Sequence, residues 1–422
     1  MKSLLPLYIC LFFLNFSNAQ VYEMLPPENI RTIRFKGAGQ EFSGTPIVQL
    51  GTPLVLTFDD LNANEENYYY KIEHYDFDWT LSDLSKNEFL DGFDNLRIMN
   101  SQNSFGTLQS YTHYELRIPN KSTQGLKVSG NYLLKILNGA GEIVFSRKFI
   151  LYETLAKVAV EIKRARDLKF IDTKQSVNFS VGSDFGAGNQ TFIFRNPKQT
   201  VKTLVVQNND LHSAISNLVP QYTIGNKLIY KYDQEASFWG GNEYLGFDSK
   251  DLRAANLGTR RIELLDIYHH YLYADGIRGD EPYTYNPDIN GRFVVTSSEG
   301  RNDVVEADYI WMHFSLFCPK ELNGGSLYLY GNFNNFALDN SNKLTYNPQT
   351  GAYETSRLFK QGFYNYKYIL LNKDGSVNSG IISGDFDETE NQYTVLVYYR
   401  ELGGRYDRIV GAGSANSRNI TN

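Results

Sequence analysis

Cysteine is almost absent from the sequence, which contains only Cys10 and Cys318. Cys10 lies inside an apolar N-terminal run, residues 4–16, that is followed by the small residues Ser17-Asn18-Ala19. We interpret residues 1–19 as a secretory signal peptide, and a cysteine inside the run gives no support to a lipid anchor. Cys318 is then the single cysteine of the mature chain. Since it has no internal disulfide partner, we expect the fold to rest on packing and Cys318 to be a small buried hydrophobic residue.

Long hydrophobic runs and an excess of basic residues are also missing. The N-terminal run is about half of the roughly 20 residues that cross a bilayer, and no later segment approaches that length. The mature chain is therefore predicted to be exported and soluble. With 41 Lys and Arg against 47 Asp and Glu, the net charge is −6, which offers no basic surface to nucleic acid or anionic lipid.

The common catalytic motifs are missing as well: there is no G-x-S-x-G elbow, no H-E-x-x-H, no P-loop and no complete G-x-G-x-x-G after a strand. His269 and His270 are adjacent in a predicted strand, so their rings point to opposite faces and cannot share a metal. Asp76 and Asp78 are expected to face solvent or to bond turns. The acidic run 385–390 lacks the spacing of a calcium loop and is expected to be a solvated loop. We expect no enzyme activity, no metal and no cofactor.

Aromatic residues, in contrast, are abundant, with 31 Tyr and 27 Phe. These side chains suit half-buried pleated surfaces. Residues 175–181 and 309–317 alternate between apolar and polar, which is the period of a strand. Turn sequences such as Asn138-Gly139, Asn323-Gly324 and Asp374-Gly375 lie between such runs. The pattern predicts an all-β protein of tandem immunoglobulin-like β-sandwich domains.

Three sandwiches are expected, since a domain takes about 100–200 residues. Polar stretches that follow apolar strands place the boundaries near residues 151–157 and 298–303. Residues 210–218 are predicted to form a short helix or turn. The predicted organisation is a signal peptide at 1–19, an N-terminal β-sandwich at 20–153, a middle β-sandwich at 154–302, a C-terminal early-set-like β-sandwich at 303–410 and a disordered tail at 411–422.

The last predicted sandwich contains YLYGNFNNF at 328–336 and GFYNYKY at 362–368. It resembles the glycogen-binding modules of the early-set sandwich group, and most matching residues are scaffold, with Tyr364, Tyr366 and Tyr368 on one strand face. In those modules a Trp that stacks on sugar ends the first motif, and here Phe336 takes its place. A second Trp is also missing near residues 372–375. The resemblance therefore implies the sandwich architecture, while a glycan site would depend on Phe336.

Motifs in all three predicted domains point to one family. They are YKIEHY at 70–75, DNLR at 94–97, SGNY at 129–132, FWGGNEY at 238–244, DINGR at 288–292, EADY at 306–309 and LFKQGFYNY at 358–366. With these motifs the chain resembles the plug-protein family of the type IX secretion system over nearly the whole mature length. The resemblance implies a non-catalytic periplasmic protein, peripherally associated with the outer membrane, that docks on the giant outer-membrane translocon barrel and occludes its pore while no cargo is present.

The partner-binding segment expected under this resemblance is the Gly-rich stretch that includes Trp239, Asn242, Glu243 and Tyr244, because Trp and Tyr are common anchors of protein interfaces. An alternative for Trp239 is that it fills the core of its own domain. The alternative for the whole protein is a periplasmic glycan-binding accessory role centred on Phe336. No small-molecule substrate, nucleic acid or direct membrane insertion is expected.

Overall fold

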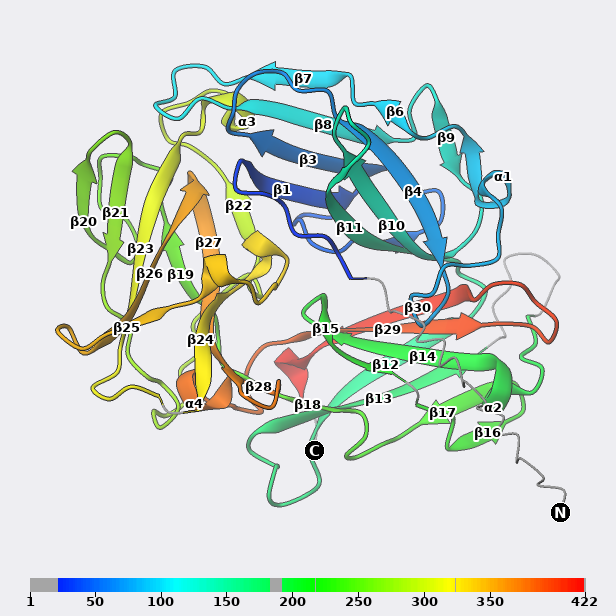
Figure 1. Cartoon of the computed structure of the whole chain (residues 1–422). Helices are drawn as coiled ribbons and strands as arrows, with labels where there is room; N and C mark the ends of the chain where they lie inside the picture. The colour runs from blue at the N-terminus through cyan, green and yellow to red at the C-terminus, as the bar shows by residue number, and fades with distance from the viewer. Residues whose placement is uncertain (1–21, 183–191, 217, 323, 421–422) are drawn as a thin grey trace, which may run out of the picture.

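The computed structural model of the protein describes residues 22–182, 192–216, 218–322 and 324–420. The predicted signal peptide lies outside the described residues. Three β-sandwiches stand at the corners of a triangle (Figure 1), which confirms the predicted all-β sandwich class. The described helices are single turns, namely α1 (Lys86–Phe89), α2 (Pro197–Thr200), α3 (Asp303–Glu306), α4 (Gly380–Ser383), η1 (Asn332–Asn334), η2 (Asn340–Asn342) and η3 (Ser417–Asn419). None of the helices in the described ranges has the length and apolar character needed to cross a membrane.

The first sandwich packs a four-stranded sheet, in the order β1-β3-β8-β7, against a five-stranded sheet, in the order β2-β11-β10-β4-β6. At the centre, Phe58 stacks on Tyr114 at 5.1 Å and meets Phe145 edge-on at 5.2 Å. The strands are β1 (Ile30–Gly37), β2 (Ile47–Gln49), β3 (Leu54–Asp60), β4 (Tyr69–Tyr75), β6 (Leu96–Arg97), β7 (Asn100–Asn103), β8 (Thr112–Ile118), β10 (Gly130–Leu137) and β11 (Ile143–Tyr152), with β5 (Leu90–Gly92) and β9 (Thr123–Leu126) forming a small separate pair.

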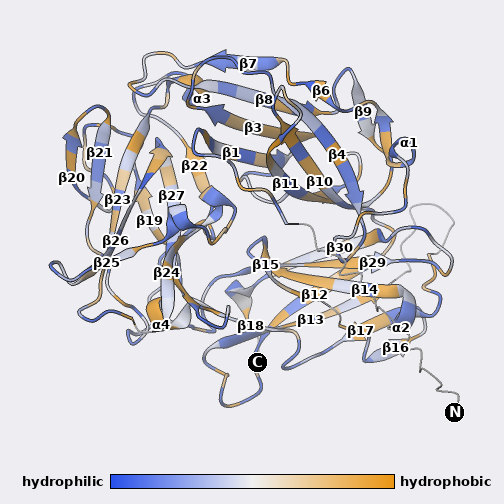
Figure 2. Ribbon diagram, viewed as in Figure 1, coloured by the Kyte–Doolittle hydropathy of each residue, from blue (hydrophilic) through white to orange (hydrophobic). Residues whose placement is uncertain are grey.

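The middle sandwich is built from two separate parts of the sequence. One sheet has the order β12-β13-β17-β16, with β18 added on β13, and the other has the order β15-β14-β29-β30. In Figure 2 the hydrophobic colouring runs along β29, in which four hydrophobic residues are 0% exposed, whereas the edge strand β7 of the first sandwich is hydrophilic. The strands are β12 (Lys157–Arg164), β13 (Lys174–Gly182), β14 (Val201–Gln207), β15 (Asp210–Ser216), β16 (Tyr222–Ile224), β17 (Lys227–Tyr230), β18 (Ser237–Trp239), β29 (Gln392–Tyr399) and β30 (Arg408–Asn416).

The third sandwich is organised around β27, which pairs with four other strands of its sheet. Tyr364 of β27 is stacked between Phe247 and Phe293, with ring centroids 5.1 Å away on both sides. The strands of this sheet are β19 (Leu245–Asp248), β22 (Phe293–Val295), β24 (Gly325–Tyr330), β27 (Gly362–Asn372) and β28 (Val377–Asn378). The facing sheet consists of β20 (Thr259–Leu264), β21 (Tyr268–Leu272), β23 (Tyr309–Phe317), β25 (Thr345–Asn347) and β26 (Ala352–Lys360).

The second and third sandwiches do not divide at residue 302 as expected. Strands β19 to β22, which were expected in the middle domain, belong to the sheets of the third sandwich. The chain then returns, and β29 pairs with β14 over seven residues, from Val201↔Tyr399 to Gln207↔Tyr393. Alternation of apolar residues predicts where a strand is, but it carries no information on which distant strand will be its partner.

Two predictions for shorter segments are also wrong, because in both cases the segment pairs with a strand that local sequence could not identify. The predicted tail at 411–422 is ordered in its described part, because β30 extends to Asn416 and pairs with β29, and η3 follows it. Its small residues fit against the neighbouring strand β12, where an added Cβ on Gly413 would lie 2.4 Å from the Val158 carbonyl oxygen. The predicted helix or turn at 210–218 is strand β15, which pairs with β14.

Candidate functional site

The FWGGNEY segment is one of two places where the chain passes between the middle and third sandwiches. The other is the acidic segment 384–391, and the two run side by side. The Phe386 amide donates to the Gly241 carbonyl at 2.8 Å, and the Thr389 hydroxyl donates to the same carbonyl oxygen at 2.8 Å. A Cβ on Gly240 would lie 1.8 Å from the Phe386 carbonyl oxygen. Glycine is therefore required at 240 by the close approach of the two backbones.

We call these two adjacent segments, 238–244 and 384–391, the double crossing. Three of the predicted partner-binding residues stabilise it. Asn242 donates to the Ser383 carbonyl at 2.7 Å. Glu243, which is 1% exposed, accepts a hydrogen bond from the Tyr283 hydroxyl at 2.6 Å and one from the Glu390 amide at 3.2 Å. The Tyr244 amide donates to Asp288. Asn242, Glu243 and Tyr244 are all buried, so the structure places them inside the junction and away from the surface.

Trp239 is the exposed member of the segment. Its side chain is 49% exposed, so it does not fill the core of its own domain. The Lys174 ammonium lies 4.3 Å above the indole ring, and Phe170 meets the ring edge-on at 5.7 Å. These contacts hold the ring in place while leaving about half of the side chain accessible. A rigid, half-exposed Trp has the properties of an interface anchor.

Trp239 borders a cavity of about 290 Å³ between the middle and third sandwiches. Lys367 lines it, with its ammonium 4.9 Å from the Tyr244 ring and 5.5 Å from the Tyr330 ring. Burial lowers the pKa of Lys367, although the carboxylate of Asp210 acts in the opposite direction. Burial raises the pKa of Asp288 behind Tyr244 to about 7, with a further contribution from the nearby charge of Glu243.

The first and third sandwiches are joined by a buried ion pair. The Lys360 ammonium lies 2.8 Å from an oxygen of Asp59, and the two side chains are 1% and 0% exposed. Asp59 also accepts a hydrogen bond from the Tyr309 hydroxyl at 2.7 Å and contacts the ring Nδ1 of His113 at 2.5 Å. Burial alone would raise the pKa of Asp59, but Lys360 and His113 outweigh it and the pKa is lowered.

The first and middle sandwiches share an apolar cluster and a carboxylate network. The cluster includes Trp79 and Ile150 from the first sandwich and Tyr398 from the middle one. Asp407 accepts from the Phe77 amide at 3.0 Å and pairs with Arg400, whose guanidinium also contacts Asp76 at 2.6 Å. Asp78, as expected, bonds a turn by accepting from the Thr80 amide and hydroxyl. Asp76, in contrast, is part of the junction.

Other sequence expectations can be placed in the structure. Cys318 is buried at 4% exposure, as predicted. His269 and His270 do point to opposite faces, because His270 is 1% exposed while His269 contacts the His313 ring at 2.9 Å. The acidic run is not the solvated loop that was expected, since Asp387 is 5% exposed. Within the described ranges no group of three or more His, Cys, Asp or Glu is arranged to hold a metal ion.

Phe336, the residue on which a glycan site would depend, is 3% exposed. Its ring lies 5.2 Å from that of Tyr330 and belongs to a small apolar cluster on β24 and β27. Phe336 lies two residues after η1 and has a backbone φ of +58°. The ring faces are therefore occupied by protein and offer no stacking surface to a sugar.

The first sandwich carries the decisive comparison. Residues 30–153 match the family described as type 9 secretion system plug protein 1st domain. Residues 30–153 belong to the family of type 9 secretion system plug protein first domains. Membership associates this chain with type 9 secretion and supports a plug role within it.

A solved structure shares the fold of this chain over nearly its whole length. It is the crystal structure of a hypothetical protein from Parabacteroides merdae ATCC 43184, with a TM-score of 0.88 and 31% sequence identity. The similarity covers 94% of this chain and 100% of that chain, so the three-sandwich arrangement is common to both. No curated protein matches the sequence.

Sequence reasoning missed the residues that lock the sandwiches together. Asp59 and Lys360 were not singled out, although Asp59 follows the mostly apolar LVLTF run of β3 and Lys360 follows Leu358 and Phe359 at the end of β26. A charge in that position is a signal of a buried pair. The partner across the junction could not be identified, because the two residues are 301 positions apart.

Proposed function

We propose that the protein is a non-catalytic periplasmic plug that docks on the periplasmic side of the outer-membrane translocon of type 9 secretion and occludes its pore when no cargo is present. The observation that carries the proposal is that all three pairs of sandwiches are joined by buried polar contacts, including the Asp59–Lys360 pair with both side chains at or below 1% exposure. Such a molecule behaves as one body. A stopper must be a folded body of this kind, too wide to be threaded through the pore.

Occlusion also has to be reversible, since cargo must later pass. A reversible contact fits an interface of ordinary size, about 1,000–2,000 Å² in total, with a polar rim and a few aromatic anchors. Trp239 is the residue of the predicted segment that remains available for such a contact, because Asn242, Glu243 and Tyr244 are committed to the junction. We therefore assign the docking face to the side of the molecule where Trp239 and the adjoining cavity lie.

The test is the permeability of the outer membrane in cells that lack the protein. Deletion is expected to admit a bulky antibiotic that the intact membrane excludes, because the translocon pore is left open. A copy with Trp239→Ala should restore the barrier only partly, whereas Tyr273→Ala, which removes an aromatic side chain of 62% exposure from the third sandwich, should restore it fully. A deletion strain altered only in its growth on a polysaccharide would contradict the plug role and favour a glycan-handling one.

A further inference from the structure

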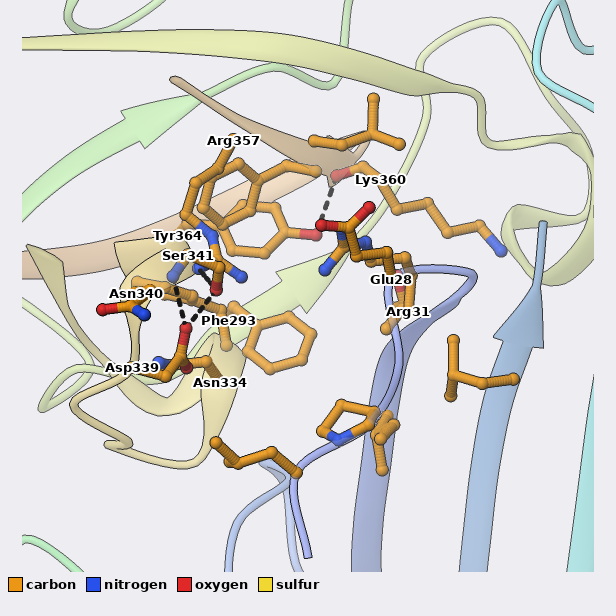
Figure 3. A pocket seen from close by; sticks show the side chains of 18 of the residues that line it. Glu28, Arg31, Phe293, Asn334, Asp339, Asn340, Ser341, Arg357, Lys360 and Tyr364 are labelled. Atoms are coloured by element: carbon orange, nitrogen blue, oxygen red, sulfur yellow. Dashed lines mark hydrogen bonds between the residues drawn. The ribbon is translucent and has the colours of Figure 1, made fainter. Parts of the chain in front are cut away.

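A second cavity, of about 350 Å³, lies between the first and third sandwiches. Figure 3 shows Arg357, Ser341 and Asp339 on one wall, and Glu28 and Arg31 on the wall that faces them. The wall of the third sandwich also presents the rings of Phe293, Phe333 and Tyr364. The cavity therefore combines charged groups with an apolar surface, at the lower end of the size range of ligand pockets, about 300–1,000 Å³.

Three guanidinium groups line this cavity. Arg31 comes from β1 and Arg147 from β11 of the first sandwich, and Arg357 comes from β26 of the third. Among the described residues, none of the three has a carboxylate within ion-pair distance. Arg147 is only 8% exposed and donates to the Ser146 carbonyl at 2.8 Å, and Arg357 donates to the Ser341 hydroxyl at 2.7 Å. The buried Nε of Arg31 has no hydrogen-bond partner in the described part of the chain.

The electrostatic consequence is an unbalanced positive charge. Burial lowers the pKa of Arg31 and of Arg147. Burial, together with repulsion from Arg31, lowers the pKa of Arg357 to about 10. Guanidinium groups otherwise stay charged at any physiological pH. All three are therefore held as cations in a partly desolvated space, where a bound negative charge would be favourable.

The carboxylates in the cavity do not neutralise these cations. Asp339 caps η2: one of its oxygens accepts from the Ser341 amide at 2.7 Å, and the other accepts from the Asn342 side chain at 3.1 Å. Glu28 lines the cavity and is exposed to solvent. Lys360 also lines the cavity, but its charge is compensated by Asp59. The two carboxylates are thus outnumbered by the three arginines, and one of the two has its oxygens already engaged.

We propose that this cavity is a binding site for the oxyanion of a small organic molecule, a carboxylate or a phosphate ester with an apolar body. The forked guanidinium donors of Arg31 and Arg357 would bind the oxygens from the two sandwiches, since arginine matches carboxylate and phosphate geometry. The apolar body would pack on Phe293 and Phe333. Because the donors come from both sides of the junction, the ligand would strengthen the contact between the first and third sandwiches. This proposal does not depend on the plug role.

The test uses the mature chain, 4-bromobenzoate, phenyl phosphate and the neutral control 4-bromobenzamide, at constant ionic strength. We expect 4-bromobenzoate or phenyl phosphate to raise the thermal unfolding midpoint saturably by at least about 2 °C, and 4-bromobenzamide to leave it unchanged. A response to the first probe alone assigns a carboxylate ligand, and a response to the second alone assigns a phosphate. Absence of a saturable response to both anions would overturn the proposal.

Variants and crystals then locate the site. Arg31→Gln and Arg357→Gln should each weaken binding at least tenfold, whereas Arg117→Gln should not, because Arg117 is exposed and pairs with Glu115 outside the cavity. If a cavity variant fails to fold, a crystal of the wild-type protein decides, soaked in 4-bromobenzoate or, where only phenyl phosphate gave a response, in 4-bromophenyl phosphate. Anomalous bromine signal within the cavity supports the site, and signal confined to the outer surface overturns it.

Discussion

The ammonium group of Lys360 is removed from water and held by a carboxylate, a backbone carbonyl and an aromatic ring. It contacts Asp59 and the Val304 carbonyl, both at 2.8 Å, and lies 4.0 Å from the Tyr111 ring. Burial lowers the pKa of this lysine, while Asp59 raises it again in part. A buried pair of this kind contributes little over an apolar pair, but the loss of one partner leaves an uncompensated charge.

Lys360→Met is therefore expected to lower the free energy of unfolding by about 3–5 kcal/mol, because Asp59 stays buried without its cation. Urea denaturation followed by tryptophan fluorescence measures this change. The matched control is Arg117→Met, which removes a cation from the exposed Arg117–Glu115 pair of the first sandwich and should cost no more than about 1 kcal/mol. Equal losses in the two variants would show that the junction does not depend on the buried pair.

A buried histidine gives a pH dependence whose sign can be worked out. Burial lowers the pKa of His74 from 6.5 to about 4, and its ring nitrogens are bonded to the Ser82 hydroxyl at 2.7 Å and the Ser129 carbonyl at 3.3 Å. Between these two pKa values the unfolded chain binds a proton that the folded chain does not. Stability therefore falls as the pH falls from 6.5 towards 4.

The measurement is the free energy of unfolding at several pH values in this window. His74→Gln should reduce the slope of the free energy of unfolding against pH by up to about 1.4 kcal/mol per pH unit, which corresponds to one proton. The part of the slope that is due to His313, whose pKa is also lowered to about 4, should remain. His212→Gln serves as the control, because that side chain is 61% exposed and its pKa is raised by Asp210. An unchanged slope in His74→Gln would show that His74 takes up its proton without loss of the folded state.

At the scale of elements, the double crossing between the middle and third sandwiches depends on the close approach of two backbones. Gly240 donates to the Thr173 carbonyl at 2.9 Å and accepts from the Asn391 side chain at 2.8 Å. The neighbouring Gly241 has a φ of +67° but open space around its Cβ position. Glycine is therefore needed at 240 because a Cβ has no space there, and at 241 because of the backbone conformation.

Gly240→Ala is expected to lower the free energy of unfolding by more than an overpacked site usually does, which is about 1–3 kcal/mol. The reason is that its Cβ would meet backbone atoms, which cannot rotate away. Gly241→Ala should lower the free energy of unfolding by about 1–3 kcal/mol, which is the cost of placing a residue other than glycine in the left-handed region. Urea midpoints compare the two variants. Since Gly240 follows Trp239, the environment of the indole should also change in Gly240→Ala alone. A smaller loss in Gly240→Ala than in Gly241→Ala would contradict the close approach.

The predicted elements show what local sequence can and cannot determine. The period-two runs at 175–181 and 309–317 lie in strands β13 and β23, and the expected shared face of Tyr364, Tyr366 and Tyr368 is buried. These predictions depend only on neighbours within one strand. The pairing of β29 with β14 depends on residues almost 200 positions apart, so the return of the chain to the middle sandwich left no local signal. In β15 the apolar residues Leu211, Ala214 and Ile215 have the spacing of a helix, so the local sequence did not indicate a strand.

For the candidate site, the sequence singled out a segment whose role stays a prediction, and its geometry could be read only from the structure. Trp239, Asn242, Glu243 and Tyr244 were predicted as one partner-binding group, and the structure separates the exposed Trp239 from three buried neighbours. The Gly-rich composition that singled out the segment has a structural cause, the contact of Gly240 with Phe386. The arginine cavity could not be predicted, because Arg31, Arg147 and Arg357 come together only when the first and third sandwiches meet.

At the scale of the whole molecule, three sandwiches close into a triangle in which each touches the other two (Figure 1). The described chain contains no disulfide, and Cys318 is free. Its cohesion therefore comes from buried pairs, shared apolar clusters and the double crossing. The family match of residues 30–153 and this architecture both support the proposal that the protein acts as a stopper at the type 9 secretion translocon.

The measurement that tests this claim most directly is purification of a tagged copy from its native envelope in mild detergent, with the associated proteins identified by mass spectrometry. We predict a very large outer-membrane barrel of the secretion system in stoichiometric amount, and less of it with Trp239→Ala than with Tyr273→Ala. Recovery of the protein without this partner, alone or with sugar-processing proteins in its place, would contradict the account.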